Sequence, residues 1–289
     1  MAQIREIKRR LKNTTSIHQI TKAMKMVATA RLKRAQQRII NARPYAYRIA
    51  EVIRRLAAHM SGGTHPLLRV RPEGRTLLLI ITADRGLCGS FNTNVLRQAQ
   101  VFLRKNPKAI LLTVGKKGRD FLRRRKYEVR REWNQVFPDV SPEVISEIRD
   151  EIEAIYVTEE IQSITALYTE FKTVVQQKVT LETLLPLKLN EVVRPESAEN
   201  HPAAGDYLFE PDEDTILNAL LSQYLAAQVR RMLLESFASE MGAKRNAMES
   251  ATKNASQMIN KLTLEFNRAR QGIITKELAE IVGGAEALR

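Results

Sequence analysis

The sequence predicts an α/β protein: a Rossmann-like, parallel-rich sheet domain inserted between two long terminal helices. Both ends can form long helices, because residues 1–43 and 212–289 contain no proline and only the second stretch contains scattered glycine. Between them, short apolar runs alternate with segments of helical periodicity, which is typical of a parallel sheet with crossover helices. We expect three parts: an amino-terminal helix over 1–60, the α/β domain over 66–210, and a carboxyl-terminal helix over 211–289.

The two terminal helices each carry a seven-residue repeat. A continuous helix over 212–289 would be about 115 Å long at the usual rise per residue. Spacings that alternate between three and four mark a seam that another helix must cover, so we expect the two helices to pair as an antiparallel coiled coil. The carboxyl-terminal seam is Met241, Lys244, Met248, Ala251, Ala255, Met258, Leu262, Glu265 and Ala269. The amino-terminal seam is Ile4, Ile7, Leu11, Thr14, His18, Thr21, Lys25, Ala28, Leu32 and Ala35.

The middle of the chain is predicted to alternate between strands and helices. The run over 76–82 is apolar enough for a strand that is buried on both faces, and the run over 109–114 is similar. Further strands are expected over 128–133, 161–171 and 176–184, with helices over 94–105, 117–125 and 142–156. The order of the strands in the sheet does not follow from the sequence.

The net charge of +15 is concentrated in the first half of the chain. Residues 1–60 hold 15 Lys and Arg against Glu6 and Glu51 alone. Such a field attracts acidic partners, nucleic acid included. Aromatic residues make up only 6% of the chain, so side chains on which bases could stack are few. A basic coiled-coil protein that binds nucleic acid is one open alternative.

Catalytic and cofactor motifs are weak. The turn after the first strand holds only Gly86 and Gly89, without the further glycine of a dinucleotide-binding fingerprint. Ser90 lacks the glycine two residues later that a nucleophile elbow requires. The four histidines have no metal-ligand spacing, and Cys88 is expected to be a small buried hydrophobe. We therefore predict no catalytic, cofactor or metal site, and a nucleotide-dependent enzyme is the second open alternative.

We expect neither a membrane span nor a removable leader. The longest purely aliphatic run, residues 77–81, is far shorter than the roughly 20 residues that cross a bilayer. The basic beginning has the composition of a transit peptide, but its repeat continues into the rest of the helix, so we expect it to be mature sequence. A single cysteine excludes an intrachain disulfide and is typical of a reducing compartment.

Motifs at both ends resemble one known family. Residues 17–28 read IHQITKAMKMVA, and residues 264–278 read LEFNRARQGIITKEL, followed by EIVGGA over 280–285. These stretches resemble the terminal helices of the gamma subunit of the F-type rotary ATP synthase. Further matches in the same order are DRGLCG over 84–89, LLPL over 184–187, YLFEP over 207–211 and ESFASE over 235–240. The resemblance covers essentially the whole chain.

The resemblance implies a rotor without a catalytic site of its own. In that family the terminal helices form a shaft inside a ring of three alpha and three beta subunits, and the α/β domain is the foot near the membrane. The beta subunits make or hydrolyse ATP, and rotation couples them to proton flow through a membrane c-ring. The implied partners are therefore the alpha, beta and epsilon subunits and the c-ring, with no nucleic acid and with membrane contact only through partners. The expected location is the cytoplasmic face of a bacterial plasma membrane.

Individual contacts follow only where this sequence matches the family motifs. Met24 and Lys25 fall in the segment that meets the beta subunits, although seam packing is an equal alternative for Met24. Lys244 stands where the family usually has arginine, so Arg245 is an alternative there. The remaining positions match residues that hydrogen-bond a beta-subunit loop. The residues expected at rotor–stator contacts are Met24, Lys25, Lys244, Arg270, Gln271, Thr275 and Glu277.

Overall fold

The computed structural model describes residues 2–59, 65–158, 161–187 and 213–287. Two long helices stand at the ends, α1 (Ala2–His59) and α5 (Glu213–Ala287), and α1 continues through Pro44. The chain forms two compact units, residues 1–29 with 244–289 and residues 30–243. Both helices contribute to both units. The three-part division made from the sequence stays a prediction.

The larger unit contains the expected sheet. Its elements are η1 (Pro66–Leu68), β1 (Arg75–Ile81), α2 (Phe91–Lys105), β2 (Ile110–Val114), α3 (Lys116–Arg124), β3 (Arg131–Trp133), α4 (Pro142–Thr158), β4 (Ile161–Phe171) and β5 (Gln177–Leu185). The strand order is β3-β2-β1-β4-β5. All neighbouring strands are parallel except β4 and β5, which form an antiparallel hairpin. The predicted parallel-rich sheet is confirmed.

Most boundaries agree with the prediction to within two residues, and two differ by three. Helix α2 begins at Phe91, three residues earlier than expected, because the Phe91 ring packs with Ala83 and Cys88 of the preceding turn. Because Asn92 and Asn94 are polar, the apolar periodicity in the sequence did not extend to this first turn. Strand β3 covers only Arg131–Trp133, shorter than the expected 128–133.

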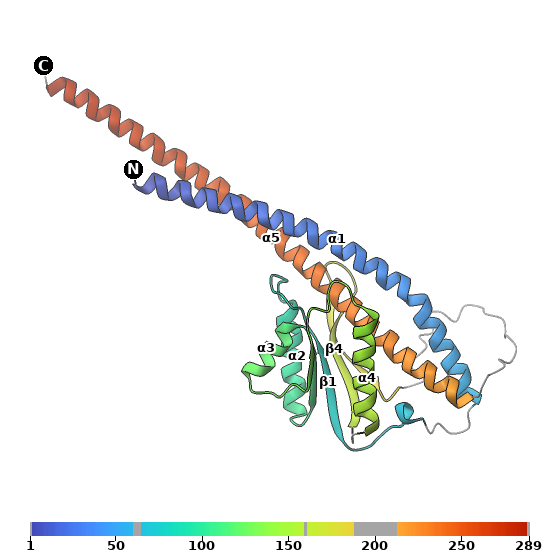
Figure 1. Cartoon of the computed structure of the whole chain (residues 1–289). Coiled ribbons are helices and arrows are strands. Elements are labelled where there is room, and N and C mark those ends of the chain that lie inside the picture. Colours follow the sequence, from blue (N-terminus) through green and yellow to red (C-terminus); the bar gives the residue numbers. More distant parts are fainter. Residues whose placement is uncertain (1, 60–64, 159–160, 188–212, 288–289) are drawn as a thin grey trace. The chain divides into compact units, whose positions relative to one another are not determined.

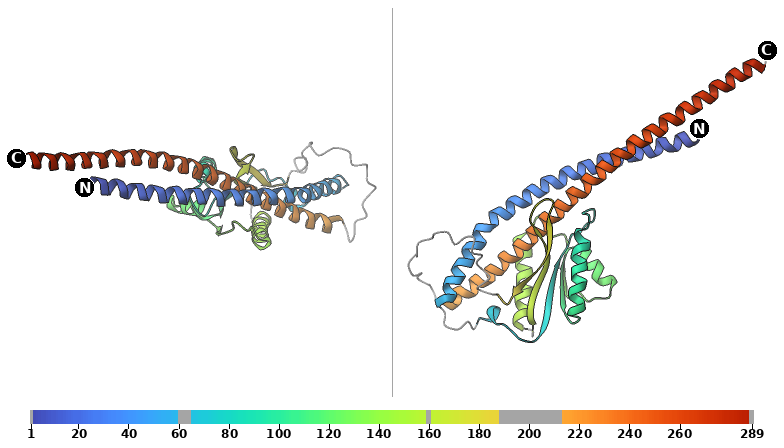
Figure 2. Two further views of the ribbon diagram at one scale, coloured as in Figure 1. Left: turned by 90° about the horizontal axis from the view of Figure 1, so that it is seen from above. Right: turned by 180° about the vertical axis from the view of Figure 1, so that it is seen from behind.

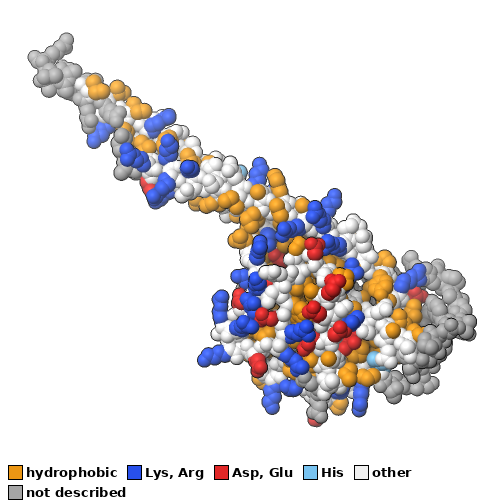
Figure 3. Space-filling model, viewed as in Figure 1, with side chains coloured by type: hydrophobic (Ala, Val, Ile, Leu, Met, Phe, Trp, Pro, Cys, Tyr) orange, Lys and Arg blue, Asp and Glu red, His pale blue; other side chains and the backbone are white. Residues whose placement is uncertain are grey.

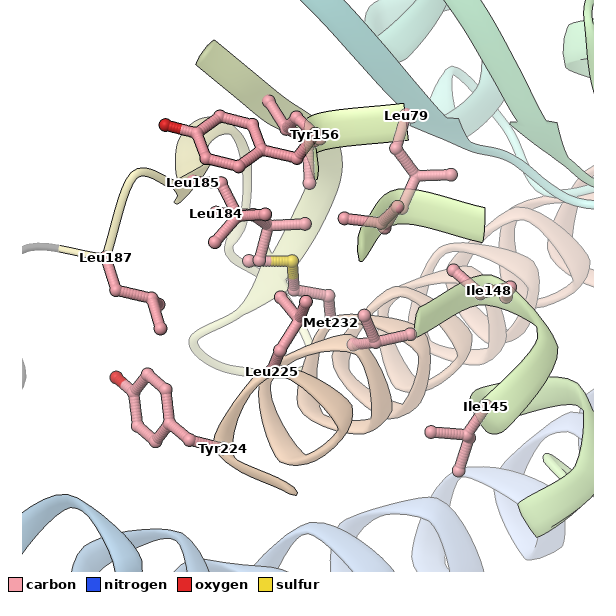
Figure 4. Packing of buried hydrophobic residues seen from close by; sticks show 14 of the residues in the cluster. Leu79, Ile145, Ile148, Tyr156, Leu184, Leu185, Leu187, Tyr224, Leu225 and Met232 are labelled. Atoms are coloured by element: carbon pink, nitrogen blue, oxygen red, sulfur yellow. The ribbon is translucent and has the colours of Figure 1, made fainter. Parts of the chain in front are cut away.

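The sheet is buried on both faces, as its apolar central strand requires. Leu78 and Ile80 of β1 face a cluster with α2 and α3. Leu77 and Leu79 face the opposite way, into the main core with α4 and α5. Figure 1 shows α2 and α3 on one side of the sheet and α4 and α5 on the other. In Figure 4, Met232 of α5 points towards the main core, whose labelled members come from β1, α4, β5 with the segment just after it, and α5.

In the smaller unit, residues 2–29 of α1 pair with α5 in antiparallel fashion. Lys25 Nζ lies 3.3 Å from Glu249 Oε1, and the Thr252 hydroxyl donates to Thr21 Oγ1 at 2.9 Å. Small side chains at the seam, such as Ala28 and Ala255, are buried. None of the predicted amino-terminal seam residues is exposed. The coiled coil and this half of its seam are confirmed.

Beyond Ala255, two of the four predicted seam residues are wrong. Met258 is 55% exposed, and Glu265 is exposed too. The half-buried residues are instead their neighbours Ile259 and Phe266. The seam therefore runs 248, 252, 255, 259, 262, 266, 269 and 273, still a seven-residue repeat but with its four-residue step first. Positions three and four residues apart both lie near one helix face, and spacing alone did not separate them.

In the larger unit the same two helices pair again. The cluster there joins Leu32, Ala35 and Ile39 of α1 with Leu234, Phe237, Ala238 and Met241 of α5. The Phe237 ring stacks on Phe137 with centroids 5.3 Å apart. Nearer the other end of α1, the Tyr45 hydroxyl donates to Gln223 Oε1 at 2.9 Å. This packing attaches α1 to the helix that also covers the sheet.

Candidate functional site

The first place to look for chemistry is the carboxyl edge of the parallel strands, where doubly wound sheets bind their ligands. At this edge, the polar side chains that could bind a ligand already accept hydrogen bonds from the protein's own backbone. The Asp84 carboxylate accepts hydrogen bonds from the backbone N–H groups of Lys116 and Gln135, both at 3.1 Å. The Thr82 hydroxyl oxygen accepts from Gly118 N at 2.8 Å. Asp84 and Thr82 therefore tie together the loops that follow β1, β2 and β3.

Helix α5 packs directly against the turn after β1. Ala243 of α5 contacts the cluster of Ala83, Cys88 and Phe91. Cys88 is buried there and accepts a hydrogen bond from Asn92 Nδ2 at 3.2 Å, as expected for a structural cysteine. The space in which a dinucleotide would lie on a Rossmann sheet is therefore partly filled by the chain itself. This geometry weighs against the nucleotide-dependent alternative.

Within the described ranges, no cluster of three or more His, Cys, Asp or Glu side chains is arranged to hold a metal ion. In those ranges there is also no helix with the length and apolar character needed to cross a bilayer. The candidate site is the outer surface of the coiled coil, where the predicted contact residues lie.

All seven predicted contact residues lie on the helices of the smaller unit. Met24 and Lys25 are half-buried on α1, and Lys25 pairs with Glu249 of α5. Lys244 is half-buried on α5. Arg245 Nη2 lies 3.9 Å from Glu249 Oε2, so a guanidinium next to Lys244 does face a carboxylate within this chain.

The other four predicted residues lie near the carboxyl end of α5. Arg270, Gln271 and Thr275 are exposed, and the side chain of Glu277 is outside the described residues. The pairing of Thr21 with Thr252 sets the antiparallel register, which brings the start of α1 level with about residue 271. Figures 1 and 2 show α5 reaching beyond the amino-terminal end of α1. Thr275 therefore lies on a stretch of α5 that α1 does not cover.

The coiled coil exposes many large apolar side chains between basic ones. Arg and Lys side chains are spread over the visible face of the helices (Figure 3). Among the side chains that the structure describes in this unit, the large apolar ones that are exposed are Ile17, Ile20, Met26, Val27, Met258, Leu264, Ile274, Leu278 and Ile281. A large exposed apolar surface is typical of a region that a partner covers. None of these residues is among the contacts predicted from the sequence. Met258 was expected on the seam, whereas the others lie off the predicted seam, which was a usable signal.

The larger unit also contains a polar cluster that was not predicted from the sequence. Arg231 of α5 contacts Glu182 of β5 and Tyr168 of β4. The spacing of Arg231 and Glu235 by four residues is visible in the sequence, but the strand partners are 63 and 49 residues away and carry no local signal. Glu235 belongs to the ESFASE motif.

Comparison with known proteins agrees with the resemblance at both chain ends. A family model described as ATP synthase matches residues 3–288. The chain is 45% identical over 289 residues to an ATP synthase gamma chain of Desulfitobacterium hafniense, and 40% identical over 293 residues to that of Geotalea daltonii. Each of these matches covers the whole of both chains.

Solved structures of ATP synthase stalks have the same fold. A central stalk and c-ring structure of the Tetrahymena thermophila mitochondrial enzyme matches with a TM-score of 0.60 and 28% identity, covering 80% of this chain and 99% of that one. A rotor structure from Euglena gracilis matches with a TM-score of 0.65 over 94% of this chain and 99% of that one; at 19% identity it supports the fold alone. The chain therefore belongs to the ATP synthase gamma chain family, the central rotor of the F-type enzyme.

Proposed function

We propose that this gamma chain works as a mechanical coupler and carries no catalytic site of its own. It would turn inside a ring of three alpha and three beta subunits, where the beta subunits carry out the ATP chemistry. The observation that supports this is the coiled coil of residues 2–29 with 244–287, whose outer surface combines basic and apolar side chains. A shaft needs such a surface, because a partner must surround it without a deep, permanent interface.

The partners and the location are part of the same proposal. The epsilon subunit and the c-ring would bind the sheet domain, and the complex would attach the chain peripherally to the cytoplasmic face of a bacterial plasma membrane. The bacterial gamma chains similar to this one support that location. Proton flow through the c-ring would then drive rotation during ATP synthesis.

We propose two groups of rotor–stator contacts. Met24, Lys25 and Lys244 would meet the basal parts of the beta subunits, with Arg245 able to replace Lys244. Arg270, Gln271, Thr275 and Glu277 would hydrogen-bond a beta-subunit loop higher in the ring. Exposure of Arg270 and Gln271 supports the second group, since a planar guanidinium beside an amide can grip a carboxylate or a backbone carbonyl.

Reconstitution tests the function directly. Purified alpha and beta subunits are assembled with and without this chain, and subunit stoichiometry and sustained ATP hydrolysis are measured. We expect one copy to join three of each subunit and turnover to depend on it. Failure to assemble, under conditions where a known gamma chain does, would refute the proposal. A steep salt-dependent affinity for duplex DNA would then favour the nucleic-acid alternative.

The contact assignment has its own test. We expect the double change Arg270→Ala and Gln271→Ala to slow ATP turnover in the assembled complex without unfolding the isolated chain. The matched control is Lys253→Ala with Asn254→Ala, which also removes a neighbouring cation and amide from exposed positions of α5. Equal turnover in both variants and the parent chain would contradict the assignment.

A further inference from the structure

One face of α5 is polar where it crosses the β4–β5 hairpin. Arg231, Glu235, Ser239 and Gly242 follow at spacings of four, four and three, so they share one side of the helix. Their flanks are apolar: the main core lies on one side, and the cluster with α1 lies on the other. A polar strip between two apolar contacts needs a specific partner, because buried polar groups are costly unless they are hydrogen-bonded.

Arg231 finds that partner on both strands of the hairpin. Its Nη2 donates to Glu182 Oε1 of β5 at 2.5 Å, and its Nη1 donates to the Tyr168 hydroxyl of β4 at 3.0 Å. The Tyr168 hydroxyl in turn donates to Glu182 Oε2 at 2.7 Å, which closes a three-membered network. The guanidinium also lies 5.7 Å from the centroid of the Tyr168 ring. These charge-assisted bonds are among the strong ones in proteins.

The strip makes further contact along the same hairpin. The Ser239 hydroxyl donates to the backbone carbonyl of Thr169 at 3.1 Å, in a buried setting. One turn on, a Cβ at Gly242 would lie 3.1 Å from Gln177 Nε2, so α5 approaches the end of the hairpin closely there. Arg231 therefore supplies two of three polar bonds between this face and the hairpin.

These hydrogen bonds restrict the rotation and sliding of α5 more strictly than the flanking apolar contacts do. Hydrophobic contact is non-directional, so a helix held by it alone can rotate or slide by small amounts at little cost. Hydrogen bonds to fixed strand atoms lose strength steeply when their angle or length changes. Tyr168 and Glu182 lie on paired strands, so the network is anchored in the sheet itself.

We propose that Arg231 is a positioning residue that fixes the rotation of α5 against the β4–β5 hairpin, so that torque passes between the shaft and the sheet domain. This inference rests on the rotor function. Without the network, the two parts would still bind each other, but the joint between them would twist more easily. Arg231 has no part in ATP chemistry and acts only through this joint.

The test measures the stiffness of the joint in the assembled complex. The alpha–beta ring is fixed to a surface, and a bead is attached to the sheet domain through Val101→Cys, an exposed position on α2. The angular variance of the bead during catalytic pauses reports the torsional stiffness of the rotor. The parent for all variants is the Val101→Cys chain, whose own Cys88 is buried and should not react.

The main variant replaces the whole network by apolar residues of similar size: Arg231→Met, Glu182→Leu, Glu235→Met and Tyr168→Phe, so that no buried hydroxyl loses its partners. Such replacements often retain stability, whereas Arg231→Met alone leaves carboxylates uncompensated and could unfold the domain. Because two of three directional bonds are lost, we expect the angular variance to rise about two- to threefold. Arg231→Lys keeps the charge and loses the fork, so a smaller rise is expected. The control, Arg149→Met, removes an ion pair with Asp150 inside α4 and should change nothing.

The angular variance and the melting temperature together decide whether Arg231 positions α5. A rise in variance in the apolar variant, with a melting temperature close to that of the parent, supports the inference, since a merely structural role would move the two together. Unchanged variance in that variant refutes it. If the apolar variant does not assemble, Arg231→Lys decides by the same measure. A parent complex that neither assembles nor rotates would instead contradict the rotor function.

Discussion

Replacing Ile259 by alanine should destabilise the coiled coil more than the same change at its neighbour Met258. Ile259 is half-buried at the seam with α1, whereas Met258 is 55% exposed. Full burial of an aliphatic side chain stabilises by about 1.5–3 kcal/mol, and truncation of a fully buried isoleucine costs about 2–5 kcal/mol. At half burial we expect Ile259→Ala to cost about 1–2 kcal/mol and Met258→Ala less than about 0.5 kcal/mol.

The assay uses the isolated chain, because in the assembled complex Met258 could contact a partner. Thermal unfolding is followed by circular dichroism, and hydrogen exchange of the amides over 255–262 assigns the loss to this part of α5. Lys253→Ala, at an exposed position of the same helix, controls for the effect of alanine on helix propensity. Equal losses at 258 and 259, or a larger loss at 258, would refute the seam described above and restore the spacing expected from the sequence.

Two further predictions concern the larger unit. Phe237→Ala should lower the free energy of unfolding by about 3–5 kcal/mol, because it removes a buried ring stacked on Phe137. Urea unfolding beside Phe237→Leu, expected to cost about half as much, checks it, and a loss below about 1 kcal/mol would contradict the packing. Burial raises the pKa of Glu235 above its ordinary 4.5, although Arg231 opposes this rise. The folded state then holds this proton more tightly than the unfolded chain does. Stability should therefore fall as pH rises through the range above 4.5, by about 1.4 kcal/mol for every tenfold difference in proton affinity between the two states. Glu235→Gln should flatten that dependence in melting temperatures between pH 4.5 and 8, and an unchanged slope would show that another group causes it.

The sheet could be predicted because its central strands are apolar on both faces. A run such as 76–82 has few alternatives once flanking turns and helices of the right length are present. The strand order could not be predicted, since parallel strands pair through long crossovers and no local signal says on which side of β1 the next strand is placed. The position of β4 beside β1 depends on the packing of α4 and α5.

The coiled coil shows the limit of periodicity more sharply. Position 255 is on the seam in both the predicted and the observed repeat, but the next seam residue can lie three or four residues on. Glu265 and Phe266 could have decided between them, because phenylalanine is a better buried residue than glutamate. Contacts with other subunits came from motif matching, since exposure alone does not say which exposed residue meets which partner.

Two kinds of contact hold α5, and they restrict its rotation to different degrees. The side towards α1 presents Leu234, Ala238 and Met241, while the polar strip of Arg231 and Ser239 lies roughly 90° away around the same turns. Small and apolar side chains let two helices pack closely without fixing their rotation strictly. Bonds to atoms of a sheet fix rotation but require buried charge, which is costly in a thin coiled coil with little interior. The sheet domain is thick enough to hold such a network, so the proposed joint lies there and the proposed contacts with the ring are left to the helix pair.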